Sequence, residues 1–361
     1  MKITMKNKAL IAMSGGVDSS VAAAIMKQKG YDCIGVTMKL YQNEEIGVSK
    51  EKTCCSLDDI EDARSVAFRL GIPYYVFNFS ADFETQVIKR FVRAYECGAT
   101  PNPCIDCNRY IKFERLFRRA QELGCDKVVT GHYAITGYDE GTGRYFLKKG
   151  ADESKDQSYV LYSLTQEQLS HLLLPLGEIK KSDARKIAEE NEFINAGKHD
   201  SQDICFVPDG DYAKFIEHYT GKEYPCGNFV DRDGNVMGEH KGIIRYTIGQ
   251  RKGLGLALKA PAYVCSKCVE RNEVILGSNE DLFSDEVTAT DINLITCDRI
   301  DGEMRIKARV RYKQPEQWAT VTQPDENTIK IKFDKPQRAI AKGQAVVMYD
   351  GDYVVGGGTI V

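Results

Sequence analysis

A glycine-containing turn between a strand and a helix is the feature that most constrains this chain. Residues 12–20 read Ala-Met-Ser-Gly-Gly-Val-Asp-Ser-Ser, after a short apolar run at 9–13 and before the helix-forming run at 21–26. Glycines let the backbone approach an anion closely, and the first N–H groups and positive end of the new helix would face that anion. The segment therefore predicts a phosphate-binding loop, made of Ala12, Met13, Ser14, Gly15, Gly16, Val17, Asp18 and Ser19.

This loop differs from the two commonest nucleotide-binding loops. It lacks the Gly-Lys-Ser/Thr ending of a Walker loop and the Gly-x-Gly-x-x-Gly of a dinucleotide site. Ser14-Gly-Gly-Val-Asp-Ser19 instead resembles the signature of ATP pyrophosphatases, which cleave ATP between its α and β phosphates and adenylate an oxygen atom. The alternative is an N-capped turn in which Ser14 or Asp18 starts an ordinary helix. The agreement of motif, strand and helix favours the phosphate loop.

Composition limits the classes of protein to consider. The chain has 361 residues, enough for two or three domains, and its formal net charge of −3 confines any nucleic-acid surface to a local patch. No apolar run reaches membrane-spanning length, and the N-terminus is too short and polar for a signal peptide. Twelve cysteines without an export signal predict a reducing, cytoplasmic location and no membrane partner.

The first half of the chain alternates strand-like and helix-like stretches. We expect buried strands at 32–40 and 72–79, a further strand at 127–130, and helices at 56–70, 81–97, 111–123, 166–174 and 182–191. This alternation predicts an α/β fold, a parallel sheet with helices on both faces, in which the loops after Met13, Leu40 and Thr130 converge.

The second half of the chain differs in composition and in hydrophobic pattern. Glycines become frequent from Tyr224, and from about Asp281 short alternating strands suggest an antiparallel barrel. We expect three domains: an ATP pyrophosphatase (HUP-like) catalytic domain at 1–207, a small β-rich central domain at 208–278, and a C-terminal β-barrel that binds tRNA at 279–361.

Two cysteine-containing segments are candidates for catalysis. Cys104 and Cys107 follow the stiff Thr100–Pro103 segment, at the start of the helix expected from Ile111, where a thiol pKa should be lowered. Cys205 lies near a histidine and carboxylates in the segment 199–206. The roles of Cys54, Cys55, Cys265 and Cys268 stay open. A zinc site is disfavoured because histidines are scarce and the cysteine pairs fall in different domains.

Together these motifs give a family resemblance over essentially the whole chain. It is similar to the tRNA-specific 2-thiouridylases, which replace the 2-oxygen of the anticodon wobble uridine with sulfur. The resemblance rests on the ordered set Ser14–Ser19, Thr100–Pro103 with Cys107-Asn108, Gly131–Tyr133, Lys155–Tyr159, Asp200–Phe206 and Tyr246–Gly253. It implies tRNA as substrate, and a cysteine desulfurase or relay protein as sulfur donor. We also expect a monomer.

The resemblance also implies roles for single residues. ATP, with Mg²⁺ offsetting its charge, is expected in the phosphate loop, with adenine near Met38 and Gly131. Adenylation makes the uridine 2-oxygen a good leaving group. By resemblance, Cys205 carries a persulfide that Cys107 attacks, which releases sulfide or leaves a Cys107–Cys205 disulfide for a reductant to reopen.

One departure from the family leaves the mechanism open. The best-known members have an aspartate thought to act in acid–base catalysis where this chain has Cys104, so the resemblance does not identify the acid–base residue of this chain. The substitution gives three thiols, Cys104, Cys107 and Cys205, that could hold a [4Fe–4S] cluster with one iron open for sulfide. The persulfide relay is favoured, and the cluster remains the alternative.

The segment Arg305–Lys313 supports RNA binding. On one strand, Arg305, Lys307, Arg309, Arg311 and Lys313 would share a face that attracts phosphates, unless acidic neighbours across the sheet neutralise it. The resemblance implies further tRNA contacts at Asn102, Pro103, His132, Lys155, Asp156, Gln157, Arg311, Tyr312 and Gln344.

Three other functions are compatible with part of this pattern. Another ATP pyrophosphatase, such as a different tRNA thiolase or an amide-forming synthetase, would share the phosphate loop, and an amide-forming enzyme would not need Cys107 and Cys205. An RNA-binding protein without catalysis would not need the intact loop. A redox or zinc-binding module would be distinguished by metal analysis of protein purified without oxygen.

Overall fold

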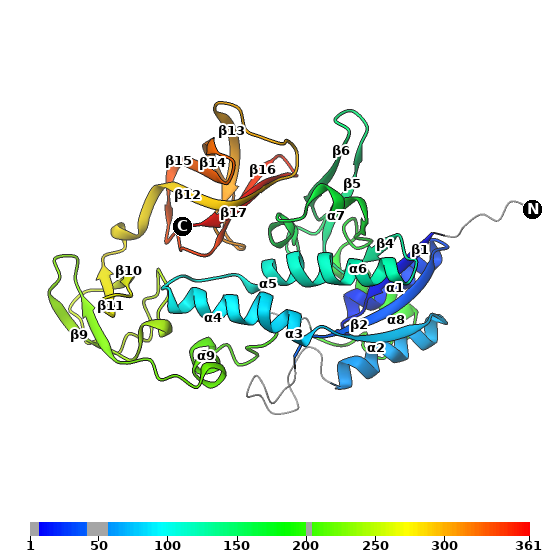
Figure 1. Cartoon of the computed structure of the whole chain (residues 1–361), viewed down its shortest axis with the longest axis horizontal. Helices are drawn as coiled ribbons and strands as arrows, with labels where there is room; N and C mark the ends of the chain where they lie inside the picture. Colours follow the sequence, from blue (N-terminus) through cyan, green and yellow to red (C-terminus); the bar gives the residue numbers. More distant parts are fainter. Residues whose placement is uncertain (1–6, 42–56, 200–203) are drawn as a thin grey trace, which may run out of the picture. The chain divides into compact units, whose positions relative to one another are not determined.

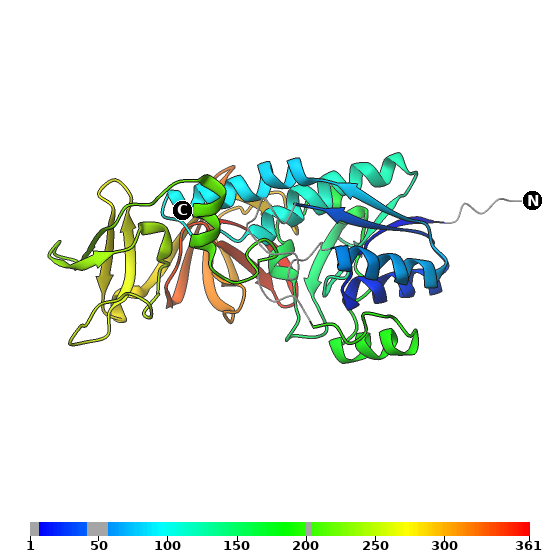
Figure 2. The same cartoon turned by 90° about the horizontal axis from the view of Figure 1, so that it is seen from below.

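The computed structural model describes residues 7–41, 57–199 and 204–361 (Figures 1 and 2). They divide into two compact units that are not contiguous in sequence. The first unit contains the chain up to Val87, then Cys104–Gly210 and Asp352–Val354. The second unit contains Ile88–Pro103, Asp211–Gly351 and Val355–Val361.

A five-stranded, all-parallel sheet forms the centre of the first unit, in the order β3-β2-β1-β4-β7. Leu10 of the central strand pairs with Ile34 on one side and Val128 on the other. The strand bounds are β1 Lys8–Ala12, β2 Asp32–Lys39, β3 Tyr74–Asn78, β4 Lys127–Val129 and β7 Leu172–Leu173. The expected parallel sheet is confirmed.

Helices cover both faces of this sheet (Figure 2). Alternate β1 residues, Ala9 and Ile11, pack with α1, α2 and α8 in one hydrophobic cluster. The blue helices α1 and α2 lie on one side of the strands in Figure 2, and α6 lies on the other. The helix bounds are α1 Val17–Gln28, α2 Leu57–Leu70, α3 Ser80–Phe83 with η1 Glu84–Ile88, α5 Pro103–Asp106, η2 Cys107–Arg115, α6 Leu116–Glu122, η3 Ser158–Leu161, α7 Gln166–Ser170 and α8 Lys181–Glu190.

Three local expectations were wrong. The strand expected to be buried at 72–79 is the edge strand β3, where Tyr75 and Val76 are exposed, because a strand has no partner beyond the sheet edge. The helix expected over 166–174 ends at Ser170, and β7 follows. The helix expected from Ile111 begins at Pro103, since proline is well suited to a first helical turn. A hairpin, β5 Ala134–Asp139 and β6 Arg144–Lys149, was not expected.

The second unit contains two β structures. A four-stranded sheet has the order β10-β11-β8-β9, and six strands at the C-terminal end form a barrel that closes where β12 pairs with both β15 and β17. The expected antiparallel barrel is confirmed. The bounds are α4 Lys89–Glu96, α9 Tyr212–Thr220, β8 Gly227–Val230, β9 Val236–His240, η4 Ile243–Arg245, β10 Tyr263–Cys268, β11 Glu273–Gly277, η5 Glu280–Leu282, β12 Phe283–Leu294, β13 Met304–Arg309, β14 Gln317–Asp325, β15 Thr328–Arg338, β16 Ala345–Asp350 and β17 Tyr353–Ile360.

The basic segment at 305–313 is only partly a strand. Ile306 and Ala308 are buried in the barrel core, as the alternation predicted. However, β13 ends at Arg309, so the expectation that Arg311 and Lys313 continue its charged face was wrong. Three of the cations also have polar partners inside the chain, because Arg305 pairs with Asp334 across the sheet, Arg309 donates to the Tyr349 hydroxyl and Arg311 donates to backbone carbonyls.

Candidate active site

The turn between β1 and α1 is held by hydrogen bonds among its own residues. The Ser14 N–H donates to Ser19 Oγ at 3.1 Å, and Ser19 Oγ donates to the Gly16 carbonyl at 3.0 Å. Ser20 Oγ donates to the same carbonyl at 3.1 Å. The serine side chains thereby fix the turn, while the twelve-residue helix α1 starts at Val17 with its unpaired N–H groups at this end.

At two positions in this region only glycine fits, because another backbone segment lies where a Cβ atom would be. Gly15 has a φ of +76°, and a Cβ there would lie 2.7 Å from the Cα of Asp59 in α2. A Cβ on Gly131, in the loop after β4, would lie 2.8 Å from the backbone N of Ser19. The structure thus brings Gly131 directly against the start of α1, where the expected convergence of strand-end loops would put it. Met38 lies half-buried near the end of β2.

The carboxylate of Asp18 is engaged by two residues from distant parts of the chain. Lys181 Nζ, at the start of α8, lies 2.7 and 2.8 Å from the two Asp18 oxygens. The Tyr133 hydroxyl donates to Asp18 Oδ1 at 2.7 Å. The Lys181 side chain is 9% exposed, so its charge lies beside the loop in a poorly hydrated position. Such a charge interacts more strongly with an anion than a hydrated surface lysine does.

A second lysine supports the other side of the loop. Lys198 Nζ contacts Asp59 at 2.6 Å and Asp62 at 2.7 Å, and lies 3.4 Å from the Gly15 carbonyl. Partial burial acts to lower the pKa of Lys198, but its hydrogen bonds to the two aspartates outweigh burial and raise that pKa. The buried Asn195 amide donates to the Gly15 carbonyl and to Ser20 Oγ, at 2.9 Å each.

The sequence did not lead us to name four residues that contact the phosphate loop or its neighbours: Tyr133, Lys181, Asn195 and Lys198. Tyr133 is the last residue of the motif Gly131–Tyr133, and Lys198 lies two residues before the motif at 200–206, so the motifs themselves were the available signal. Lys181 and Asn195 have no local signal, because only the fold brings positions 163 to 180 residues away to the loop.

The helix that carries Cys104 and Cys107 has an unusual local geometry. It begins at Pro103 with the α-helical turn α5 and continues as the π-helical segment η2 from Cys107 to Arg115. Such π segments inside helices often occur at functional sites. The buried Asn108 amide donates to the Val160 carbonyl at 3.0 Å, which fixes the segment next to Cys107.

The environment of Cys107 contradicts the expectation of a lowered thiol pKa. Cys107 is only 8% exposed, and burial raises its thiol pKa to about 11, against a smaller opposite effect of Lys112. Because the helix begins at Pro103, Cys107 lies one turn inside it and not at its mouth. Desolvation therefore outweighs the helix dipole. Cys104, in the first turn, is exposed.

Cys205 is anchored through its backbone. The Tyr41 hydroxyl donates to the Cys205 carbonyl at 2.7 Å. The next residue, Phe206, is buried against Phe83 with ring centroids 5.7 Å apart. The thiol-bearing residue itself is half-buried. Among the described residues no hydrogen bond or disulfide joins Cys107 to Cys205, and Cys54, Cys55 and 200–203 lie outside the described part of the chain.

The remaining candidates near the loop make internal contacts. Burial lowers the pKa of His132 well below its ordinary value, so the ring is neutral, and its Nδ1 lies 2.8 Å from Thr130 Oγ1. The buried Asp156 carboxylate accepts from the N–H groups of Gly150 and Ser158. Gln157 accepts from the Tyr133 N–H through its side-chain oxygen. These groups shape the loops, and Lys155 beside them is half-buried.

Within the second unit, the Thr100–Pro103 segment is bound to barrel residues. The Thr100 N–H donates to the Lys342 carbonyl at 2.7 Å, and Gln344 Nε2 donates to the Thr100 carbonyl at 2.7 Å. The loop that contains Asn102 and the buried Pro103 is therefore part of the same unit as the barrel, and the candidate tRNA contact Gln344 binds this loop directly.

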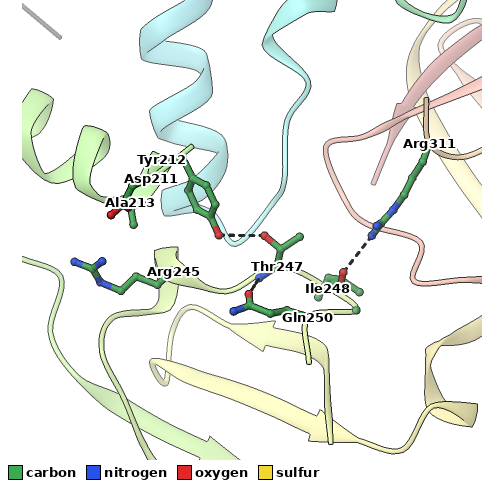
Figure 3. Close-up of a pocket in the computed structure, with 9 residues that line it drawn as sticks. Asp211, Tyr212, Ala213, Arg245, Thr247, Ile248, Gln250 and Arg311 are labelled. Carbon is green, nitrogen blue, oxygen red and sulfur yellow. Dashed lines mark hydrogen bonds between the residues drawn. The ribbon is translucent and has the colours of Figure 1, made fainter. Parts of the chain in front are cut away.

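A cavity of about 550 Å³ in the second unit is lined by residues 247–250 of the Tyr246–Gly253 motif, by Arg245 and Arg311, and by the start of α9 with the preceding Asp211 (Figure 3). The Arg311 guanidinium donates to the carbonyls of Ile248 and Ala339, at 3.1 and 2.7 Å. The Gln250 side chain accepts from the Thr247 N–H at 3.0 Å. The Gln250 side chain and the Arg311 guanidinium thus stabilise the conformation of this loop through its backbone groups. Tyr312 follows in a half-buried turn after β13.

Comparison with known proteins identifies the family. Family models match residues 7–209 ("tRNA methyl transferase HUP domain"), 213–278 ("tRNA methyl transferase PRC-barrel domain") and 284–360 ("Aminomethyltransferase beta-barrel domain"). The tRNA-specific 2-thiouridylase MnmA of Clostridioides difficile (strain 630) is 52% identical over 99% of this chain and 98% of its own length. The chain belongs to the tRNA-specific 2-thiouridylase family.

A second member of this family, from Acetivibrio thermocellus, is 51% identical over 98% of this chain and 99% of its own length. A solved 4-thiouridine synthetase–RNA complex with bound ATP aligns with 60% of this chain and 50% of its own at 18% identity, and its TM-score of 0.36 is too low to support an argument. In the described residues, no helix has the length and apolarity needed to cross a membrane.

Gly15→Ala should damage the phosphate loop. The new Cβ would face both a positive φ and the backbone of Asp59, and we expect destabilisation of roughly 1–3 kcal/mol with weakened ATP binding. Gly30→Ala is the matched control, since it has a φ of +82° and open space around the Cβ. Thermal unfolding and ATP titration measure both effects. Equal losses in the two variants would contradict the role of the Asp59 contact.

Cys107 should be alkylated more slowly than Cys104 at neutral pH. With its thiol pKa raised to about 11, Cys107 is almost entirely protonated at pH 7, and its reaction rate should rise about tenfold per pH unit up to pH 10. Peptide mass spectrometry after timed iodoacetamide treatment measures each thiol separately. A rate for Cys107 that is already constant above pH 8 would mean that its thiolate is stabilised.

Proposed function

We propose that this chain is a tRNA-uridine 2-sulfurtransferase. It uses ATP to adenylate the 2-oxygen of the anticodon wobble uridine and then replaces that oxygen with sulfur, giving 2-thiouridine, AMP and pyrophosphate. The observation that carries the proposal is the full-length similarity to 2-thiouridylases together with an intact loop at Ser14–Ser19 between β1 and α1. We further propose that it acts in the cytoplasm as a monomer.

In the first step, the phosphate loop binds the polyphosphate of ATP. The N–H groups at the start of α1 donate to phosphate oxygens, and Gly15 allows the close approach. Lys181 adds a positive charge beside Asp18 where negative charge is released on pyrophosphate. Met38 and the loop at Gly131 provide the adenine site. The uridine 2-oxygen attacks the α phosphate, and pyrophosphate leaves.

In the second step, two cysteines deliver sulfur. A cysteine desulfurase or a relay protein first forms a persulfide on Cys205. The Cys107 thiolate attacks the Cys205 sulfur, so that a disulfide forms between the two cysteines and hydrosulfide leaves. Hydrosulfide attacks C2 of the adenylated uridine and AMP leaves. An external dithiol then reduces the disulfide and is itself oxidised. Burial of Cys107 keeps its thiol protonated until this encounter.

The two implied inorganic groups place different demands on the described residues, because Mg²⁺ bound to the phosphates of ATP needs few protein ligands whereas an iron–sulfur cluster needs an assembled set of thiols. Among the described residues, no three His, Cys, Asp or Glu side chains gather into a set that could hold a metal ion, so Cys104, Cys107 and Cys205 do not form a cluster site. The carboxylate of the phosphate loop, Asp18, is already neutralised by Lys181. We therefore assign the chemistry to ATP, the lysines and the thiols.

Substitution of the two relay cysteines should separate the steps. Cys107→Ser and Cys205→Ser should each abolish 2-thiouridine formation, because each removes one sulfur of the relay. Cys205→Ser should still form AMP and pyrophosphate from ATP in the presence of tRNA. Nucleoside analysis by mass spectrometry and a pyrophosphate assay measure the two steps.

Cys97→Ser is the matched control, since Cys97 is exposed and outside the proposed relay. Loss of adenylation in Cys205→Ser as complete as the loss of thiolation would contradict the division of roles. Thiolation by both relay variants would refute the cysteine mechanism itself.

Lys181→Gln should impair adenylation. Removal of the ammonium leaves Asp18 without its cation and the polyphosphate without a nearby positive charge, so we expect adenylation to slow at least tenfold with unchanged tRNA affinity. Lys186→Gln, an exposed position on the same helix, is the control. Pyrophosphate release at saturating ATP and tRNA is the measurement. Wild-type rates in Lys181→Gln would exclude Lys181 from phosphate chemistry.

A further inference from the structure

The outer face of the C-terminal barrel carries an exposed indole. Trp318, in β14, is the only tryptophan of the chain and is 49% exposed. Its strand neighbours alternate with it, because Ala319 and Val321 are completely buried in the barrel core. Lys307 of β13 lies directly opposite Trp318 in the antiparallel register, so the two side chains share the outer face.

Two cations lie against this ring. The Arg305 guanidinium is 5.2 Å and the Lys307 ammonium 5.3 Å from the centre of the Trp318 ring. Arg305 also pairs with Asp334 of β15, whereas no carboxylate of the described residues pairs with Lys307. The cation–π contacts hold both basic groups next to an aromatic surface that solvent can still reach.

The cationic character continues along the same face. Arg309 lies two residues beyond Lys307 on β13, and its guanidinium lies 4.8 Å from the ring of Tyr349 in the neighbouring strand β16 and donates to the Tyr349 hydroxyl. Lys330 and Lys332 are exposed on β15, and Lys332 contacts Glu286 and Asp285. The face therefore presents five cations, Arg305, Lys307, Arg309, Lys330 and Lys332, against three acidic partners, Asp285, Glu286 and Asp334.

We propose that this face, centred on Trp318, is a stacking site for an unpaired nucleotide of the tRNA. An indole stacks on any nucleobase, and neighbouring cations bind the adjoining phosphates. An excess of cations around an exposed aromatic ring complements a polyanion that carries unstacked bases. The inference rests on the proposed function and extends it. The charge pattern of the sequence had already assigned phosphate contacts to Arg305, Lys307 and Arg309, but neither that pattern nor the resemblance indicated a base contact at Trp318.

The single tryptophan makes the test direct. Acrylamide quenching of Trp318 emission in the full-length protein is measured with increasing amounts of an unmodified tRNA substrate. We expect the quenching constant to fall at least twofold at saturation, because a stacked base shields the indole. A fully paired RNA duplex of matched length is the control probe and should protect Trp318 less.

Variants report the contribution to affinity. Trp318→Ala should weaken binding of labelled tRNA about tenfold, the effect of losing one stacked base, and Trp318→Phe should restore most of it. Lys307→Gln should reduce the slope of log affinity against log salt by about one. Phe68→Ala, which removes an exposed ring in the first unit, is the matched control and should bind tRNA as the unaltered protein does.

Two results overturn the inference without touching the proposed function: unchanged acrylamide quenching with bound tRNA, or unchanged tRNA affinity in Trp318→Ala, while the protein still forms 2-thiouridine. Protection of Trp318 by rising protein concentration without RNA would instead assign the face to a second copy of the chain. Tight tRNA binding with Trp318 protection but no 2-thiouridine would uphold this face and refute the proposed function.

Discussion

The close packing of backbone around the first turn of α1 is the constraint on which the rest of the site depends. Gly15 lies against α2 and Gly131 against Ser19, so loops from two strands and a helix meet within van der Waals distance. Lys181 and Lys198 then neutralise the carboxylates gathered there. Because these charges are paired, the acidic side chains would not repel a polyphosphate bound as we propose, and the amide groups of the turn would be available to it.

The parts of the fold that follow from local pattern could be predicted from the sequence. The strand–turn–helix at 8–28 and the helix with Ala63 and Ala67 facing the core match their expected positions, because apolar spacing reports which face is buried. The exposure of β3 and the end of β13 at Arg309 could not be predicted, since sheet order and strand ends depend on partners far away in sequence.

In the candidate site, too, the residues in a local motif could be predicted and those brought in from distant positions could not. Its loop residues were evident from their motif, whereas Asn195 and Lys181 acquire their roles only when the chain returns to the loop. Cys107 illustrates a competition between two physical effects. A position near a helix start favours the thiolate, but enclosure in an apolar setting favours the neutral thiol, and the second effect is larger. Burial cannot be read from sequence spacing.

The interlaced path of the chain has a practical consequence for dissecting this enzyme family. The polypeptide leaves the first unit after Val87, re-enters it at Cys104, leaves again after Gly210 and contributes Asp352–Val354 near its end. No single cut yields either half intact. A polypeptide that stops before the barrel would lack the anchors that hold the Thr100 loop, so the two halves are better separated by point substitutions in the whole protein than by truncation.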